Sequence, residues 1–188
     1  MIKIAILASG SGSNAENIIQ YFLKDKNVEI TYVLSNKKDA FVLKRAKKLG
    51  VKSQVFSNKD IKEENGLLNL LKAEADFIVL AGFLLKVPEN IINTFPNKII
   101  NIHPALLPKY GGKGMYGMHV HRAVKENNEK ETGITIHYVN ENYDEGAIIF
   151  QATTRLTEKD TPETIADKIH LLEQEHFPRV IEEVILKA

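Results

Sequence analysis

The sequence predicts an α/β fold: a single domain with a Rossmann-like, mostly parallel sheet, helices on both faces, and an antiparallel hairpin in the C-terminal part. Three observations favour this fold. Through the first hundred residues, short apolar runs alternate with helically spaced runs, an order typical of a parallel sheet covered by helices. Two β-rich runs joined by NENYDEG predict the hairpin. The length, 188 residues, suits one well-buried domain over residues 1–188 better than two.

The elements of the first half follow from residue patterns. Ile2–Leu7 is apolar and rich in β-branched residues, and Asn14–Lys24 has apolar residues at helical spacing. Asp60 with Glu63 predicts a capping box that starts a helix running to about Ala73. The remaining elements expected here are strands at Ile30–Leu34, Val51–Phe56, Asp76–Leu80 and Ile99–Ile102, and helices at Ala40–Leu49 and from Pro88 to about Asn93.

The second half has a different pattern. Pro104–Met118 holds two prolines and four glycines and predicts a loop, followed by a helix at His119–Asn127. Thr132–Val139 and Ala147–Leu156 are the two hairpin strands. Thr161 followed by a proline predicts the start of the last helix, because it combines an N-cap residue with proline at the first helical position.

Composition narrows the class of protein. The formal net charge is +1, which gives no sign of a nucleic-acid-binding surface. The absence of cysteine excludes disulfides, thiolate metal sites and cysteine nucleophiles. No apolar stretch approaches the roughly 20 residues that span a bilayer, and the N-terminal apolar run is too short for a signal peptide. We therefore expect a cytoplasmic protein that acts on small molecules, with no nucleic-acid or membrane partner.

The loop after the first strand resembles a phosphate-binding turn. Residues 10–15, GSGSNA, fit the loose pattern G-x-G-x-x-G/A, which alone is equally consistent with a plain strand-to-helix turn. A dinucleotide site needs an acidic residue after the second strand, but that position reads SNKK, with no acid until Asp39. A dinucleotide is disfavoured, although a 2′-phosphorylated one could use the lysines. Binding of one phosphate by backbone N–H groups remains.

A second chemical signal is the sequence Asn101-x-His103 at the end of a predicted strand. Strand alternation puts both side chains on one face, about 7 Å apart. An amide donor and a titratable imidazole are what acyl-type transfer needs, although a buried hydrogen-bonded pair is the alternative. No G-x-S-x-G elbow supports serine catalysis. A zinc site is disfavoured because a helical His-x-His pair splays its side chains; its ligands would be His103, His119, His121, His137 and Asp144.

Several segments together resemble the folate-dependent phosphoribosylglycinamide formyltransferase family, over nearly the whole chain from Ile2 to about Ile181. The segments are NIHPALLPKYGGKGMYGMHVHRAV, ILASGSGSN, LAGF and YDEGAIIFQ. The resemblance implies one formyltransferase domain over residues 1–188. It also implies transfer of the formyl group of 10-formyltetrahydrofolate to the amine of glycinamide ribonucleotide, in de novo purine (IMP) biosynthesis. It implies no metal, and we expect a monomer or a weak homodimer.

The resemblance also implies site residues. Catalysis would use Asn101, His103 and Asp144, and the ribonucleotide would contact Gly12, Ser13, Asn14 and Glu175. Folate would contact Asn101 and Asp144 together with Lys59, Leu84, Leu85, Lys86, Val87, Asn140, Glu141, Asn142 and Tyr143. One departure concerns the folate tail, because Leu84-Leu85 follows Phe83 where the family often has arginine.

The resemblance suggests roles that can be tested. Asn101, and His103 when protonated, would donate hydrogen bonds to the tetrahedral oxyanion, while Asp144 would orient His103 and raise its pKa. We expect His119 and His121 on a helix surface, with substrate contact by one of them as the alternative. We expect His137 as a satisfied core residue, with support of the catalytic residues as the alternative, and Tyr110–Met118 as a candidate lid. A nicotinamide-dependent oxidoreductase and a non-catalytic binder of sugar phosphates remain as alternative functions.

Overall fold

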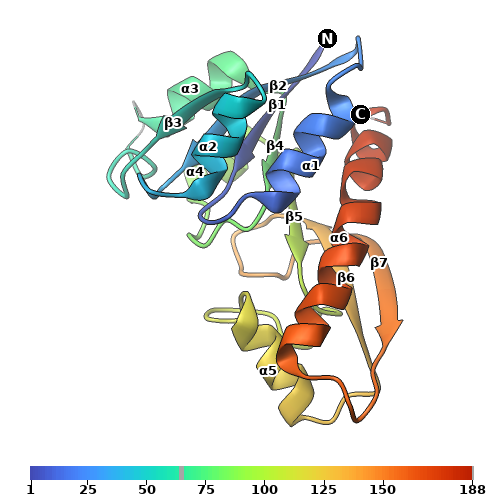
Figure 1. Ribbon diagram of the computed structural model, residues 1–188. Coiled ribbons are helices and arrows are strands. Elements are labelled where there is room, and N and C mark those ends of the chain that lie inside the picture. Colours follow the sequence, from blue (N-terminus) through green and yellow to red (C-terminus); the bar gives the residue numbers. More distant parts are fainter. Residues whose placement is uncertain (64–65, 188) are drawn as a thin grey trace. The chain divides into compact units, whose positions relative to one another are not determined.

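The computed structural model describes residues 1–63 and 66–187 (Figure 1). Its contacts divide the chain into two compact units, Met1–Ile100 with the last two residues, and Asn101–Leu186. Each unit is described by itself below, and the expectation of one domain over residues 1–188 stays a prediction. Among the described residues, no helix has the length and apolar content required to cross a bilayer.

The first unit is built from alternating strands and helices. Its elements are β1 (Ile2–Leu7), α1 (Ser13–Phe22), β2 (Val28–Ser35), α2 (Phe41–Lys48), β3 (Lys52–Val55), α3 (Leu67–Glu74), β4 (Phe77–Leu80), α4 (Glu89–Thr94) and the start of β5 (Ile99–His103). Strand β1 pairs in parallel with β2 and with β4, and β2 pairs in parallel with β3. The carboxyl ends of these strands therefore lie at one edge of the sheet, where the loop after β1 begins.

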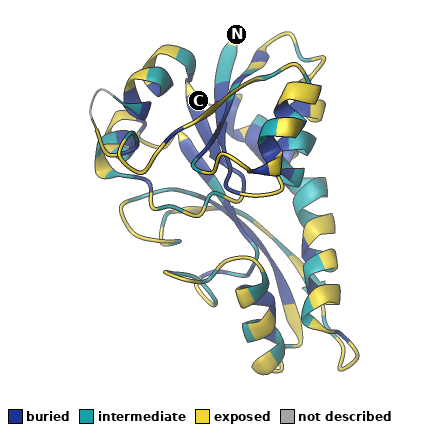
Figure 2. Cartoon of the chain, turned by 60° about the vertical axis from the view of Figure 1, so that its left-hand side comes forward, coloured by how far each residue is buried: buried dark blue, intermediate teal, exposed yellow. Residues whose placement is uncertain are grey.

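The core of the first unit explains why its strands are continuous apolar runs. Every residue of β4, and Ile4–Leu7 in β1, is buried, so both faces of these strands are covered (Figure 2). Helices α1 and α2 contact β2, and α3 contacts β1. Helix α1 buries Ala15, Ile18, Ile19 and Phe22, which recur at helical spacing.

The second unit combines a hairpin with two helices. It contains the rest of β5, then α5 (Met118–Glu126), β6 (Glu131–Tyr138), β7 (Ile148–Arg155) and α6 (Pro162–Ile185). Strands β6 and β7 pair antiparallel, from Glu131 opposite Arg155 to His137 opposite Ile148. Helix α6 starts at a reciprocal capping box between Thr161 and Thr164, with proline at its first position.

The strand order is β3-β2-β1-β4-β5-β6-β7, parallel in its first part and ending in the antiparallel hairpin. This arrangement confirms the predicted α/β fold class with its mostly parallel sheet.

The start of one predicted helix is wrong: of the helix expected from Asp60 to about Ala73, the structure has α3, Leu67–Glu74, so the predicted end holds and the start does not. The capping box expected at Asp60 and Glu63 is instead formed one turn earlier, where Ser57 and Asp60 exchange backbone N–H to side-chain hydrogen bonds. That box starts only a short turn, and helix α3 begins at Leu67 after Gly66. Part of the predicted helix, residues 64–65, lies outside the described residues. The Ser57 hydroxyl accepts the hydrogen bond from the Asp60 N–H that the predicted box assigns to Glu63. The Asp60–Glu63 spacing alone does not reveal this alternative partner.

Candidate active site

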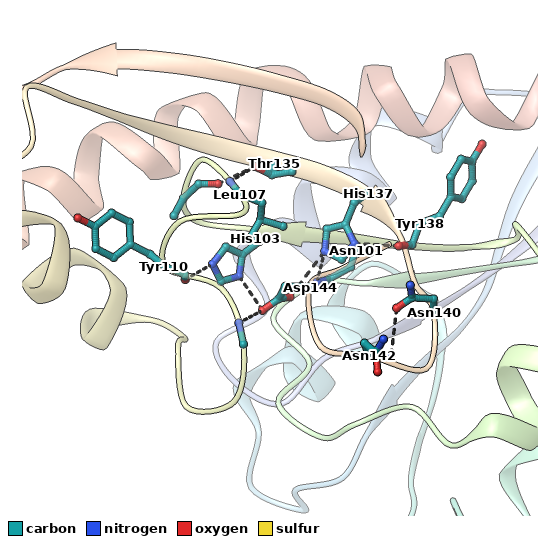
Figure 3. Close-up of polar contacts among 12 residues, drawn as sticks. Asn101, His103, Leu107, Tyr110, Thr135, His137, Tyr138, Asn140, Asn142 and Asp144 are labelled. Atoms are coloured by element: carbon teal, nitrogen blue, oxygen red, sulfur yellow. Dashed lines mark hydrogen bonds and ion pairs between the residues drawn. The ribbon is translucent and has the colours of Figure 1, made fainter. Parts of the chain in front are cut away.

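Strand β5 carries the two polar residues at the centre of the site in the second unit (Figure 3). Asn101 and His103 alternate along the strand and point toward a loop that contains Asp144. The side chain of His103 is buried, with 5% exposed, and that of Asp144 is nearly so, with 12% exposed. The structure therefore brings together the three residues that the sequence resemblance implied as catalytic.

One nitrogen of the His103 imidazole has a hydrogen-bond partner that fixes it as a donor. Its Nε2 lies 2.7 Å from the carbonyl oxygen of Tyr110, and because a carbonyl only accepts, Nε2 carries the hydrogen. Its Nδ1 lies 3.6 Å from Oδ2 of Asp144, slightly long for a hydrogen bond. In the neutral ring, the lone pair is consequently on Nδ1, which is the atom able to accept a proton.

Asp144 is held by its own loop and by a turn from another part of the second unit. Its backbone has a φ of 56°, in the left-handed region. Its Oδ2 accepts a hydrogen bond of 2.9 Å from the N–H of Gly112, and its Oδ1 lies 3.7 Å from Nε2 of His137. The carboxylate thus lies between two imidazoles.

His137 was expected as a core residue, with support of the catalytic residues as the alternative. It is buried with both ring nitrogens bonded, as expected of a core histidine, but one partner is Asn101, whose Nδ2 donates to Nε2 over 3.1 Å. The other nitrogen, Nδ1, donates to the carbonyl oxygen of Tyr138 over 2.8 Å. These bonds require one tautomer of His137, and that tautomer fixes the amide orientation of Asn101. The sequence signal for this role was its position three residues before the 140–144 loop.

The pKa of His103 depends on a balance between burial and the groups around the ring. Burial lowers it below the ordinary 6.5, and the negative charge of Asp144 and the bond to Tyr110 offset only part of that effect. Asp144 therefore acts to raise the pKa of His103, as expected, but burial outweighs that effect. The sequence identified the charge but not how deeply the ring is buried.

For the pKa of Asp144, nearby groups outweigh burial. Burial acts to raise its pKa, but the charge of a protonated His103 and the hydrogen bond from the Gly112 N–H lower the pKa below 3.8. Asp144 is therefore an anion at neutral pH, beside an imidazole that is predominantly neutral.

The loop after β1, in the first unit, has a defined backbone. Gly12 has a φ of 77° and is the N-cap residue of α1, where a Cβ would lie 2.3 Å from Val42 Cγ2. Ser13 and Asn14 are the first two residues of α1, so their N–H groups belong to its N-terminal turn. Arg45 of α2 donates to the carbonyl of Ser11 and pairs with Glu16. The three residues implied in phosphate binding are thus consecutive at one helix start.

The residues implied in folate binding fall in both units. In the first unit, Leu84 is exposed, its N–H donates to Ser9 Oγ, and Val87 is buried. Leu85 is half-buried, and Lys86 is exposed. Lys59 is exposed and pairs with Glu63 at 3.5 Å.

In the second unit, the loop implied in folate binding runs from Asn140 to Tyr143 and leads into Asp144. Glu141, Asn142 and Tyr143 are exposed, and the side chain of Asn140 accepts from the N–H of Asn142. The loop therefore offers exposed side chains and a locally braced backbone next to Asp144.

The remaining predicted residues, Glu175, His119 and His121, differ from one another in how exposed they are. Glu175 is exposed, with 64% of its side chain accessible, and its Oε2 lies 3.9 Å from Nε2 of His176. His121 is buried, so the expected surface position is wrong for it, and its Nδ1 has no hydrogen-bond partner. His119 is exposed, as expected. Residues 1–63 and 66–187 contain no group of three or more histidine or acidic side chains arranged to hold a metal ion.

Comparisons with known proteins give the class of protein. The model of the formyl transferase family matches residues 2–181. The crystal structure of phosphoribosylglycinamide formyltransferase from Streptococcus pneumoniae TIGR4 superposes on this chain with a TM-score of 0.86 and 32% sequence identity. The match covers 98% of this chain and 99% of that one. The chain therefore belongs to the formyl transferase family.

Two curated relatives are longer. The chloroplastic phosphoribosylglycinamide formyltransferase of Arabidopsis thaliana is 39% identical over 181 residues, which cover 93% of this chain and 61% of that protein. The trifunctional purine biosynthetic protein adenosine-3 of Chironomus tentans is 37% identical over 188 residues, covering 95% of this chain and 13% of that protein. This chain thus spans less than two thirds of either relative.

Proposed function

We propose that this chain transfers the formyl group of 10-formyltetrahydrofolate to the amine of glycinamide ribonucleotide, giving formylglycinamide ribonucleotide and tetrahydrofolate. The observation that carries the proposal is the network in which Asn101, His103, His137 and Asp144 meet at the end of β5. Membership of the formyl transferase family supports the reaction type. The names of the relatives in Arabidopsis thaliana and Streptococcus pneumoniae support the acceptor.

In the proposed reaction, the amine nitrogen of the ribonucleotide attacks the formyl carbon. A carbon–nitrogen bond forms, and the carbonyl electron pair moves to oxygen. Asn101 uses one N–H on His137, so its other N–H is the donor for that oxyanion. His103 accepts a proton from the attacking nitrogen on Nδ1, because burial lowers its pKa and keeps the ring neutral.

The intermediate then collapses. The oxyanion re-forms the carbonyl, the bond from carbon to the folate nitrogen breaks, and the proton passes from Nδ1 of His103 to that leaving nitrogen. Asp144 stabilises the imidazolium while it exists, because its carboxylate lies 3.6 Å from Nδ1. The amine is itself the nucleophile, so no covalent enzyme intermediate is needed.

We assign the remaining contacts as the resemblance implied. Gly12, Ser13 and Asn14 would bind the ribonucleotide phosphate through N–H groups at the start of α1. Leu84–Val87, Asn140–Asp144 and Lys59 would contact folate. Glu175 would contact the ribonucleotide. Activity in the cytoplasm, as part of purine biosynthesis, belongs to this proposal.

A transfer assay tests the proposal. The purified 188-residue chain is mixed with 10-formyltetrahydrofolate and glycinamide ribonucleotide, and absorbance follows the loss of the donor. We expect the donor to be consumed only when both substrates are present. An oxidoreductase would instead change the absorbance of a nicotinamide cofactor, and a non-catalytic binder would consume neither substrate. Donor loss that does not depend on the ribonucleotide would contradict the assigned acceptor.

A further inference from the structure

A short turn in the second unit connects the two ends of the proposed catalytic pair. The carbonyl of Tyr110 accepts from Nε2 of His103, and two residues later the N–H of Gly112 donates to Asp144. Gly111, between them, is closely surrounded, since a Cβ there would lie 2.6 Å from Leu107 Cδ2 and 3.3 Å from Asp144 Cβ. The backbone of residues 110–112 therefore sets the positions of both side chains (Figure 3).

Tyr110 has a backbone conformation that is unfavourable for a residue with a side chain. Its φ is 58°, in the left-handed region that non-glycine residues seldom adopt. Such a conformation persists only where surrounding contacts hold it. Besides the bond from His103 to its carbonyl, Tyr110 has a contact at the far end of its side chain, where the phenol hydroxyl donates to Oε1 of Glu129 over 2.9 Å. Lys109 donates to the same oxygen, also over 2.9 Å.

Glu129 lies outside the reacting centre. It lies in the short connection between α5 and β6, and its own N–H donates to the carbonyl of Val124. Lys109 and Tyr110 lower the pKa of Glu129, while burial and Glu129 raise the pKa of Tyr110 to about 12. The acceptor is therefore ionised and the donor protonated throughout the neutral range.

We propose that Glu129 is a positioning residue for formyl transfer. By holding the hydroxyl of Tyr110, it holds the Tyr110 carbonyl on Nε2 of His103, and the lone pair of the neutral ring then stays on Nδ1. This inference rests on the proposed function, in which Nδ1 accepts the proton of the attacking amine. A purely structural role for Glu129 would affect stability without changing the tautomer of His103.

The test uses two variants that break the contact from opposite sides. Tyr110→Phe removes only the hydroxyl, and Glu129→Ala removes its acceptor. Glu129→Gln keeps an oxygen that accepts the same bond. Tyr32→Phe is the matched control, because it removes a phenol hydroxyl in the first unit. For each protein, kcat and KM are measured, and the ¹⁵N shifts of His103 are read in histidine-labelled protein, with His103→Gln to assign the signals.

We expect kcat to fall about tenfold in Tyr110→Phe and in Glu129→Ala, with KM for both substrates changed by less than about twofold. The double variant should be no slower than either single one, because both remove the same contact. In each, the His103 nitrogens should shift from protonation at Nε2 toward a mixture of tautomers. Glu129→Gln should retain most of the activity, and Tyr32→Phe all of it.

Two results would overturn the proposal: folded variants with wild-type kcat, or a fall in kcat with unchanged His103 nitrogen signals. The nitrogen signals also separate this inference from the proposed function. If the wild-type chain transfers no formyl group, the proposed function fails, while the signals still decide whether Glu129 sets the tautomer of His103.

Discussion

The position of the hydrogen on the His137 ring determines how the Asn101 amide is oriented. Because His137 donates from Nδ1 to Tyr138, its Nε2 in the neutral ring accepts from Asn101. The amide nitrogen of Asn101 is thereby turned toward His137, with its second hydrogen left for a ligand oxygen. An oxyanion donor that is oriented before substrate binds needs no reorganisation during the reaction.

Replacement of Asn101 by alanine tests that donor. We expect kcat of Asn101→Ala to fall on the order of 10²–10³-fold, because one oxyanion hydrogen bond is lost. Asn127→Ala removes an exposed amide from the end of α5 and serves as the control, with wild-type turnover expected. Near-wild-type formyl transfer by Asn101→Ala in steady-state assays would remove Asn101 from the mechanism.

The pKa of His103 predicts a pH dependence. A base must be deprotonated, so kcat should be constant through neutral pH and fall only below 6.5, since burial lowers the pKa of this ring. In Asp144→Asn, the charge that raises the His103 pKa is absent, so that pKa should be lower still. Rate profiles and an NMR titration of His103 between about pH 5 and 9 check both statements. A midpoint above 6.5 in the wild type would contradict the role as a neutral base.

The residues of this network differ in how far the sequence could predict them. Asn101 and His103 could be placed together because strand alternation puts them on one face. The proximity of His103 to Asp144 came from a family resemblance, not from spacing. The tautomer of His137, the burial that lowers the His103 pKa and the buried position of His121 depend on tertiary contacts that no local pattern encodes.

At the scale of the element, the loop before α1 depends on one glycine. Gly12→Ala should reduce the free energy of unfolding by about 2–4 kcal/mol, because a Cβ there meets Val42 and the φ of 77° disfavours any side chain. It should also raise KM for the ribonucleotide. Urea unfolding and steady-state kinetics measure both effects.

Gly10→Ala provides the control for Gly12→Ala within the same loop. A Cβ on Gly10 meets nothing within 4 Å, so its unfolding free energy should change by less than about 0.5 kcal/mol. Equal losses in the two variants would show that the close approach of α2 to Gly12 is unimportant.

The start of helix α6 depends on Asp160. Its carboxylate accepts from Lys168, Thr157 and Thr164, and these bonds hold its pKa well below the usual 3.8. A lowered pKa stabilises the folded state above 3.8, and the contribution is lost as the pH falls toward the lowered value. Asp160→Asn should therefore be less stable than wild type at pH 7, with a difference that shrinks below pH 3.8. Urea unfolding against pH checks this, with exposed Asp167→Asn as the control.

Element boundaries show where sequence patterns are sufficient. Strands β1 and β4 and helix α6 were predicted within a residue or two at the ends assigned, because buried apolar runs and a Thr-Pro start are strong local signals. The helix start expected at Asp60 was wrong because two capping boxes were possible, and the Ser57–Asp60 box was formed. Local spacing cannot decide between two such boxes when both use the same carboxylate.

For the whole molecule, we expect a monomer or a weak homodimer. Large apolar side chains that are at least half exposed come from separate elements, as with Phe41 of α2, Ile148 of β7 and Leu171 of α6. Single exposed apolar residues of this kind are ordinary on soluble proteins. Sedimentation velocity at micromolar concentration should give a mass near 21.2 kDa, with at most partial association. A dimer that survives dilution to nanomolar concentration would contradict this.

The hairpin loop that contains Asp144 ends at Gly146, a position that accommodates only glycine. A Cβ on Gly146 would lie 1.6 Å from the carbonyl oxygen of Tyr138, a separation that no side chain tolerates. Glu141, Asn142 and Tyr143, in contrast, are exposed. A mutagenesis library designed to broaden donor choice should therefore randomise 141–143 and keep residue 146 invariant, because diversity at that codon would yield misfolded clones rather than new specificities.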